Sequence, residues 1–211
     1  SALLMGLTDP TCGLVMGSTG EVLAHEFGIG RSEQDHFALK SHEKAVAAIH
    51  AGQFQDQITP LYVGKKFRPI VQDIGPREKQ SAVELARLKP IFDKRDGTVT
   101  VGNACQVTDG AVALLMMSSE MARAEGMSIR AHVRAYATAA LEPQRMGLGP
   151  VYAIDQLLDN TKLSLRHIDL IEINEAFAVQ VLACLKAMAS NAFCQRRLGR
   201  ISAIGEIDPN K

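Results

Sequence analysis

The sequence predicts an α/β protein in which a mostly helical first part is followed by alternating strands and helices. Three observations carry this prediction. Apolar residues recur at helical spacing through much of the chain up to about Lys94. From Gly97 onward, short β-branched and apolar runs lie between glycine-containing turns. Residues 168–188 begin as a six-residue apolar run and change to a helical period at Asn174, which is typical of a buried strand that leads into a helix.

The first part of the chain is expected to be mostly helical. Thr19 and Ser32 are candidate N-caps for its first two helices, because a hydroxyl can accept a hydrogen bond from a free amide of the first turn. Gly52 ends the second helix, and Pro90 closes the last one, since proline disfavours helix at the residue before it. The expected elements are a polar turn at 16–21, helices at 22–27 and 33–51, a strand at 58–63, a basic turn at 64–68 and a helix at 81–88.

The second part follows a boundary placed near residues 94–97. The β-branched stretch GTVTVGN at 97–103 precedes the turn Asp109–Gly110, which leads into an apolar run short enough for a buried strand. The expected elements are strands at 111–117, 129–138 and 168–173, helices at 119–125, 151–159 and 192–199, a glycine-rich loop at 146–150, and the helix that starts at Asn174.

Composition excludes several classes of protein. A chain of 211 residues with 46% hydrophobic residues can bury a sizeable core in one or two domains. Its 23 basic and 23 acidic residues balance and form no long run, so nothing calls for nucleic acid or an anionic membrane as partner. No apolar stretch approaches the ~20 residues of a transmembrane segment.

Cysteine and histidine usage gives no metal or disulfide pattern. The four cysteines have neither CxxC nor zinc spacing, so we expect free thiols in a reducing compartment and a cytoplasmic location. His36 and His42 lie six positions apart, on different faces of one predicted helix. We therefore expect no metal site.

Asn174 is the main candidate for a functional residue. Open α/β sheets bind ligands at the carboxyl ends of their strands, and helix N-termini present free N–H groups. An Asn amide at such a junction can cap the helix, or it can hold a water or a developing oxyanion. The plain N-cap is the simpler interpretation, and the residues alone leave both open.

The stretch NEAFA at 174–178 resembles the strand–helix signature of the thiolases, which cleave or form 3-ketoacyl-CoA. Collinear similarity extends along almost the whole chain. The sequence of residues 188–208 is most similar to that of the fatty-acid β-oxidation branch, the thiolase partner of the trifunctional complex. The other matching blocks are MGSTGE at 16–21, QD and FA within 34–38 with SH at 41–42, QF at 53–54, the region of Arg77 to Pro90, GTVTVGNACQVTDGA at 97–111 and MGLGP at 146–150.

The resemblance implies a partial thiolase fold. A thiolase has two similar βαβαβαββ halves, with a mostly helical loop domain inserted into the first. Residues 1–96 resemble the loop domain, 97–118 the last-strand region of the first half, and 119–211 the first part of the layered α/β/α second half. The nucleophilic cysteine would lie upstream of Ser1, and the GHP histidine and the acid/base cysteine downstream of Lys211. The chain is therefore expected to be an internal fragment, inactive by itself.

The function implied is acyl transfer. The parent enzyme would cleave 3-ketoacyl-CoA with CoA to acetyl-CoA and a shortened acyl-CoA, or condense two acetyl-CoA, through a cysteine thioester. CoA and acyl-CoA would be substrates, with no cofactor, and the full-length protein would be a homo-oligomer or a subunit of a β-oxidation complex. Two alternatives are a CoA- or acyl-CoA-binding module without catalysis and an interaction fragment that only docks with other chains.

The resemblance also assigns residues. Asn174 would orient a water in an oxyanion hole, and Arg77 would pack against the CoA adenine, as a planar guanidinium can. Cys105 stands where the family commonly has Ser, which puts that pantetheine contact in doubt, and it does not lie in a nucleophile motif. The remaining candidates are apolar and would otherwise pack in the core: Val101, Val107, Ala176 and Phe177 near the pantetheine, Met16 on the pantetheine arm, and Leu7 and Met146 in the substrate pocket.

Overall fold

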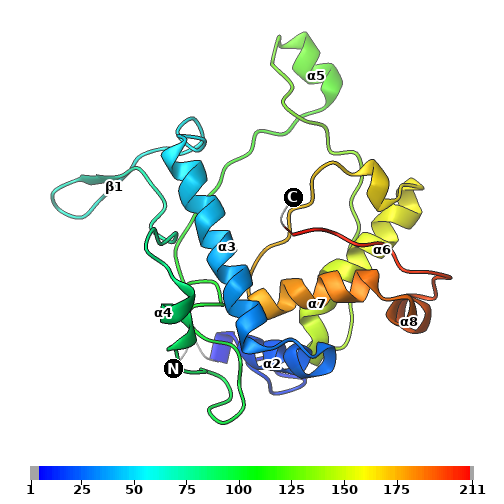
Figure 1. The fold of residues 1–211 in the computed structure, drawn as a ribbon. Coiled ribbons are helices and arrows are strands. Elements are labelled where there is room, and N and C mark those ends of the chain that lie inside the picture. Colours follow the sequence, from blue (N-terminus) through cyan, green and yellow to red (C-terminus); the bar gives the residue numbers. More distant parts are fainter. Residues whose placement is uncertain (1–4, 210–211) are drawn as a thin grey trace.

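The computed structural model describes residues 5–209, so the first four and last two residues of the predicted organisation lie outside it. It is rich in helices and has one small hairpin (Figure 1). In chain order, the elements are α2 (Met16–Phe27), α3 (Arg31–His50), β1 (Leu61–Val63), β2 (Arg68–Ile70), α4 (Ala82–Ala86), α5 (Ser119–Ala124), the 3-10 helix η1 (Pro143–Leu148), α6 (Gly149–Thr161), the 3-10 turn η2 (Leu165–His167), α7 (Ala178–Ala189), α8 (Asn191–Phe193) and the π-helical turn η3 (Cys194–Leu198).

The core lies where α2 and α7 pack together with η1 and α6. Leu23, Val179 and Met188 are fully buried there. Most residues of α7 are apolar, and most of them are buried. Each large aliphatic side chain contributes about 1.5–3 kcal/mol when fully buried. The C-terminal half of the chain therefore supplies the central helix of the core, and the N-terminal half supplies its main partner.

The starts of the first two helices differ from the prediction. The stretch at 16–21, predicted as a turn, is the first half of α2, and its N-cap is Val15. Thr19 lies inside that helix and donates to the carbonyl of Met16 at 2.6 Å. The N-cap of α3 is Gly30, so Ser32 is the second helical residue and caps nothing. Packing of α2 against α7 outweighs the turn-like composition of MGSTGE.

A polar network fixes residues 97–103 between α2 and α3. The Glu21 carboxylate accepts hydrogen bonds from the amides of Thr98 and Val99, each at 2.9 Å. The Asn103 amide donates to Asp35 at 3.0 Å, and its oxygen accepts from the Thr100 amide at 2.8 Å. Each bond to a charged group stabilises by about 1.5–3 kcal/mol. The β-branched GTVTVGN stretch is therefore held by side chains and forms no extended ladder.

The predicted strand at 58–63 is confirmed only in its last three residues. These form β1, which pairs antiparallel with β2 in the register Leu61–Ile70, and both strands are exposed. The predicted helix at 81–88 contains the shorter α4. Ser81 is its N-cap, and its hydroxyl accepts from the Glu84 amide at 3.2 Å.

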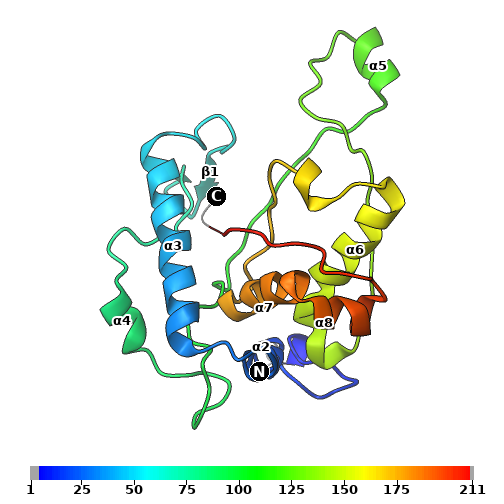
Figure 2. The same ribbon diagram turned by 45° about the vertical axis from the view of Figure 1, so that its right-hand side comes forward.

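Three strand predictions are wrong. Residues 111–117, 129–138 and 168–173 are not strands in the structure, because the described residues supply no strand that pairs with them. In the first of these segments, Val112 and Leu114 are 87% and 79% exposed. The first two segments flank α5 and reach away from the packed helices (Figures 1 and 2).

The later helices follow the prediction more closely. The predicted helix at 119–125 is α5, and the one at 151–159 lies within α6. The MGLGP loop is helical, because η1 runs directly into α6 there. The predicted helix at 192–199 corresponds to α8 and η3. Among residues 5–209, none of the helices has the length and hydropathy needed to span a membrane.

Candidate functional site

A short antiparallel bridge joins two of the predicted site segments. Ala104 pairs with Phe177. The Cys105 amide donates to the Ala176 carbonyl at 2.8 Å, and the Ala178 amide donates to the Asn103 carbonyl at 2.9 Å. The NACQ and NEAFA stretches therefore lie side by side, which brings Cys105, Ala176 and Phe177 close together.

Beside this bridge lies a cavity of about 470 Å³, which we call the Arg77 cavity after one of its lining residues. It runs between α3, the loop at 73–80 and residues 101–109. Its volume falls in the range of small-molecule sites, about 300–1,000 Å³. Three predicted residues, Arg77, Val101 and Cys105, line it. Polar lining residues that the prediction did not assign are His42, Asp73, Gln106, Asp109 and Glu175.

The loop at 73–80 carries Arg77 and is attached to the rest of the structure at several points. The Arg77 backbone N–H donates to Nδ1 of His42 at 3.2 Å. Gln106 Nε2 donates to the Gly75 carbonyl at 2.9 Å. His50 and Glu78 approach to 3.0 Å at the far end of the loop. The position of Arg77 thus depends on α3 and on residue 106, and not only on its own loop.

His42 has an electrostatic environment that favours its neutral form. Burial lowers the pKa of His42, and the nearby Arg77 cation lowers it further, while the Glu175 carboxylate opposes this shift. A neutral imidazole can leave Nδ1 without a proton and accept a hydrogen bond there. This agrees with the bond that it accepts from the Arg77 amide.

Asn174 does not cap α7, so the capping interpretation is wrong. The helix starts at Ala178, and its N-cap residue is Phe177. Asn174 is exposed, and its side chain makes no hydrogen bond with the residues that the structure describes. Its neighbour Glu175 accepts a hydrogen bond from the Ser41 hydroxyl at 2.5 Å, which ties this segment to α3. The Asn174 amide is thus accessible to water or ligand.

The other predicted residues do not line the Arg77 cavity. Leu7 and Met16 are adjacent, since the Met16 amide donates to the Leu7 carbonyl at 3.0 Å. Met146 lies in η1 and Val107 is exposed. Phe177 packs edge-on against Phe92, with ring centroids 6.3 Å apart, and contacts the hydrophobic core. Phe177 therefore has a packing role whatever it contacts in the site.

The four cysteines are free and differ in exposure. Cys184 and Cys194 are buried, and burial raises the pKa of Cys184 to about 11. Cys105 is exposed and is the thiol that lines the Arg77 cavity. No cluster of three or more His, Cys, Asp or Glu residues suited to a metal ion occurs within the described part of the chain.

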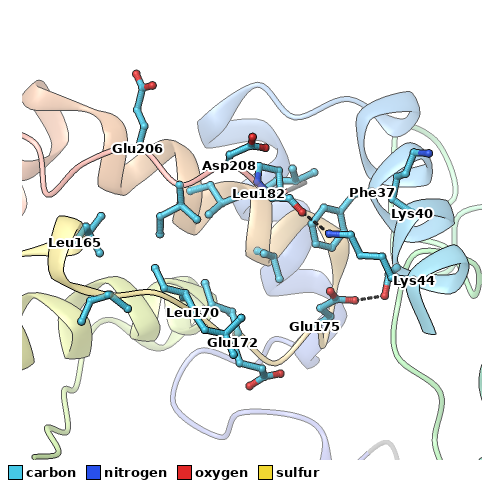
Figure 3. A pocket seen from close by; sticks show the side chains of 18 of the residues that line it. Phe37, Lys40, Lys44, Leu165, Leu170, Glu172, Glu175, Leu182, Glu206 and Asp208 are labelled. Atoms are coloured by element: carbon cyan, nitrogen blue, oxygen red, sulfur yellow. Dashed lines mark hydrogen bonds between the residues drawn. The ribbon is translucent and has the colours of Figure 1, made fainter. Parts of the chain in front are cut away.

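A larger hollow of about 600 Å³ lies next to the Arg77 cavity along α3 (Figure 3). It is bounded by α3, residues 168–175, α7 and residues 206–209, and apolar residues such as Leu170 and Leu182 line it. The Ser41–Glu175 bond lies in the wall that it shares with the smaller cavity. None of the predicted CoA or oxyanion residues lines this hollow. The Arg77 cavity is therefore the better candidate site, although it is smaller.

His42, Gln106 and Glu175 line the cavity and were not predicted from the sequence. The available signal was that each lies in a block that matches the thiolase pattern: SH, NACQ or NEAFA. Arg77, the partner of His42, lies 35 positions along the chain. No local pattern indicates a bond between an imidazole and a backbone amide over that separation.

Comparison with known proteins identifies the family. Residues 1–120 match the family description "Thiolase, N-terminal domain", and residues 127–204 match "Thiolase, C-terminal domain". The 3-ketoacyl-CoA thiolase of Yersinia pestis (strain Pestoides F) is 40% identical over 206 residues, which are 97% of this chain and 47% of that protein. A 3-ketoacyl-CoA thiolase of Yersinia pseudotuberculosis serotype O:3 (strain YPIII) has the same identity and coverage. The chain thus spans about half the length of these curated relatives.

Solved structures agree with the sequence matches. The acetyl-CoA acetyltransferase of Bacillus anthracis superposes with a TM-score of 0.85 at 39% identity, covering 99% of this chain and 52% of that one. Human mitochondrial 3-ketoacyl-CoA thiolase in complex with CoA gives 0.84 at 39% identity, covering 88% of this chain and 46% of that one. With matches of this extent in both sequence and structure, the chain belongs to the thiolase family and has part of its α/β fold.

Proposed function

We propose that this chain supplies the CoA-binding and oxyanion-hole part of an acyl-CoA C-acyltransferase. The complete enzyme would cleave 3-ketoacyl-CoA with CoA to acetyl-CoA and a shortened acyl-CoA, or condense two acetyl-CoA. The observation that carries the proposal is the bridge between residues 103–105 and 176–178, which brings NACQ and NEAFA together beside the cavity that Arg77 lines. The human relative whose structure contains CoA supports the choice of ligand.

The proposed roles follow the chemistry of each side chain. Asn174 orients a water that stabilises the oxyanion as the thioester forms and breaks. Arg77 packs its guanidinium against the adenine. Apolar contacts along the pantetheine come from Val101, Val107, Ala176 and Phe177, with Cys105 beside them and Met16 on the pantetheine arm. Leu7 and Met146 belong to the substrate pocket. CoA is a substrate here, and the proposed reaction uses neither cofactor nor metal.

The organisation of the whole protein is also proposed. Residues 1–96 form the loop domain, 97–118 the last-strand region of the first half, and 119–211 the start of the second half. The complete protein is proposed to be a cytoplasmic enzyme of fatty-acid β-oxidation that works as a homo-oligomer or within a β-oxidation complex. The similarity to 3-ketoacyl-CoA thiolases supports the choice of substrate in this proposal.

A substitution of Asn174 tests this function. The suitable protein is a full-length chimera in which this chain replaces the matching half of the Y. pestis relative. Asn174→Ala should lower kcat by about 10²–10³, as loss of other oxyanion-hole donors does. The melting temperature should change little, because Asn174 does not cap α7. Asn160→Ala, at an exposed position of α6, is the matched control. Unchanged kcat in Asn174→Ala would exclude the oxyanion role.

A further inference from the structure

Two neighbouring residues of α3 form hydrogen bonds to the two walls of the Arg77 cavity. Ser41 donates to Glu175, in the segment before α7. His42 accepts from the backbone N–H of Arg77, in the loop at 73–80. The two walls are therefore linked through one turn of a helix that is itself twenty residues long. A change at His42 acts on the Arg77 wall and leaves the Ser41–Glu175 bond in place.

The bond to the Arg77 amide requires a particular protonation state of His42. A protonated imidazole carries hydrogen on both ring nitrogens and can accept at neither. Protonation would therefore break the bond from the Arg77 N–H and place a second cation beside the Arg77 guanidinium. Glu175 is the anionic group that opposes this repulsion. Asp73, Asp109 and Cys105 are the other titratable side chains around the same cavity.

We propose that His42 is a positioning residue for CoA binding: its neutral imidazole holds the loop at 73–80 so that Arg77 faces the adenine, and acid releases this contact. The part of this inference that concerns CoA rests on the proposed function. The part that concerns the loop rests only on the hydrogen bond between Arg77 and His42.

Another hydrogen bond of the loop makes the expected change local. The Gln106–Gly75 bond involves no titrating group, so it persists in acid. Acid should therefore free the Arg77 amide while the loop stays attached at Gly75.

Amide hydrogen exchange of the ¹⁵N-labelled 211-residue chain tests the loop directly, without CoA. The protection factor of the Arg77 amide should fall about two- to tenfold as the pH drops through the pKa of His42, because a single hydrogen bond contributes protection of that order. The fall should occur below the ordinary histidine pKa of 6.5, since both burial and Arg77 lower it.

Three variants separate positioning by His42 from a general effect of acid. In His42→Asn, a side-chain oxygen that does not titrate can accept near the place of Nδ1, so protection should stay high at every pH. In His42→Leu it should be low at every pH. His36→Gln, an exposed change on the same helix, should keep the pH dependence of the wild type. If His42→Leu does not fold, as far-UV circular dichroism would show, the His42→Asn profile still decides.

CoA affinity, measured by titration calorimetry at the same pH values, gives the functional readout. The ratio of the wild-type dissociation constant to that of His42→Asn cancels the titration of CoA itself. This ratio should be near one at about pH 8 and rise two- to tenfold once the pH has fallen through the pKa of His42. Complete absence of CoA binding would contradict the proposed function, and the exchange data would still decide the role of His42. An Arg77 protection factor that is flat with pH in the wild type, or that falls equally in His42→Asn, would overturn the inference.

Discussion

At the scale of single residues, Arg77 is the group whose role can be separated most cleanly from catalysis. Arg77 and Cys105 both line the Arg77 cavity. In the full-length chimera, Arg77→Ala should weaken CoA binding by ~0.5–2 kcal/mol, the range of cation–π contacts, or roughly threefold to thirtyfold. KM for CoA should rise while kcat barely changes, because the adenine contact is equal in ground and transition states.

The control for this prediction is Arg87→Ala. Arg87 is an exposed arginine at the end of α4 that does not line the cavity, so its loss should leave both constants unchanged. A collapse of kcat in Arg77→Ala with an unchanged KM would rule out an adenine-binding role. Steady-state kinetics at several CoA concentrations decides between these results.

Motifs that resemble the thiolase pattern suggested part of the candidate site. Cys105, Ala176 and Phe177 belong to such motifs, and the structure places them together because a two-bond bridge joins those motifs. His42 and Glu175 also lie within matching blocks, but their contacts could not be predicted from those blocks. Their partners, Arg77 and Ser41, lie on other elements, and such pairings follow from how α3 packs and not from the sequence around each residue.

At the scale of elements, the sequence predicted which segments are helices better than where they begin. The turn predicted at 16–21 is wrong because Gly, Ser and Thr favour turns in isolation, whereas here they allow α2 to approach α7. Val99 and Val179 lie within 3.5 Å of where a Cβ on Gly20 would be. Tertiary packing thus overrides local propensity at this helix start.

Gly147 shows the same effect and gives a stability prediction. The sequence assigns it to a glycine-rich loop, yet it lies where η1 meets α2 and α7. A Cβ at Gly147 would lie 2.8 Å from Leu23 and 2.9 Å from Gln180, and both are buried. Gly147→Ala should therefore lower the free energy of unfolding by about 1–3 kcal/mol, as overpacking does. Urea denaturation measures this. Gly110→Ala, with nothing near its Cβ, should be nearly neutral, and equal stability of the two variants would contradict the packing argument.

At the scale of the whole molecule, the missed strands have one physical cause. An apolar run of six or seven residues indicates a buried strand, but a strand also needs neighbours for its backbone groups. Residues 111–117 form neither helix nor strand, and Leu115 and Met116 are 76% and 70% exposed. The described residues provide the apolar pattern without a pairing partner. The apolar pattern alone therefore did not predict the secondary structure of these segments, because a strand forms only where its backbone groups can pair.

Two features of the whole chain bear on its activity. A thiolase needs an activated thiolate as nucleophile. Cys184 and Cys194 are buried, and the pKa of Cys184, raised to about 11, keeps that thiol protonated near neutral pH. Cys105 is exposed and shares a cavity with His42, so it is the one thiol there with an imidazole nearby. The His42 Nδ1 is already occupied by the Arg77 amide, and Cys105 lies in no segment that resembles the nucleophile motif of the family.

The 211-residue chain should therefore show no thiolase turnover when it is incubated with acetoacetyl-CoA and CoA. Loss of the 3-ketoacyl thioester, followed by its absorbance, should match the rate without protein. The full-length chimera is the positive control, and it should turn over because it adds the remaining half of the relative. The informative variant is Cys105→Ser, which restores the residue common in the family. Turnover by the chain that disappears in Cys105→Ser would make Cys105 a nucleophile and contradict the assignment of this chain to binding and oxyanion stabilisation alone.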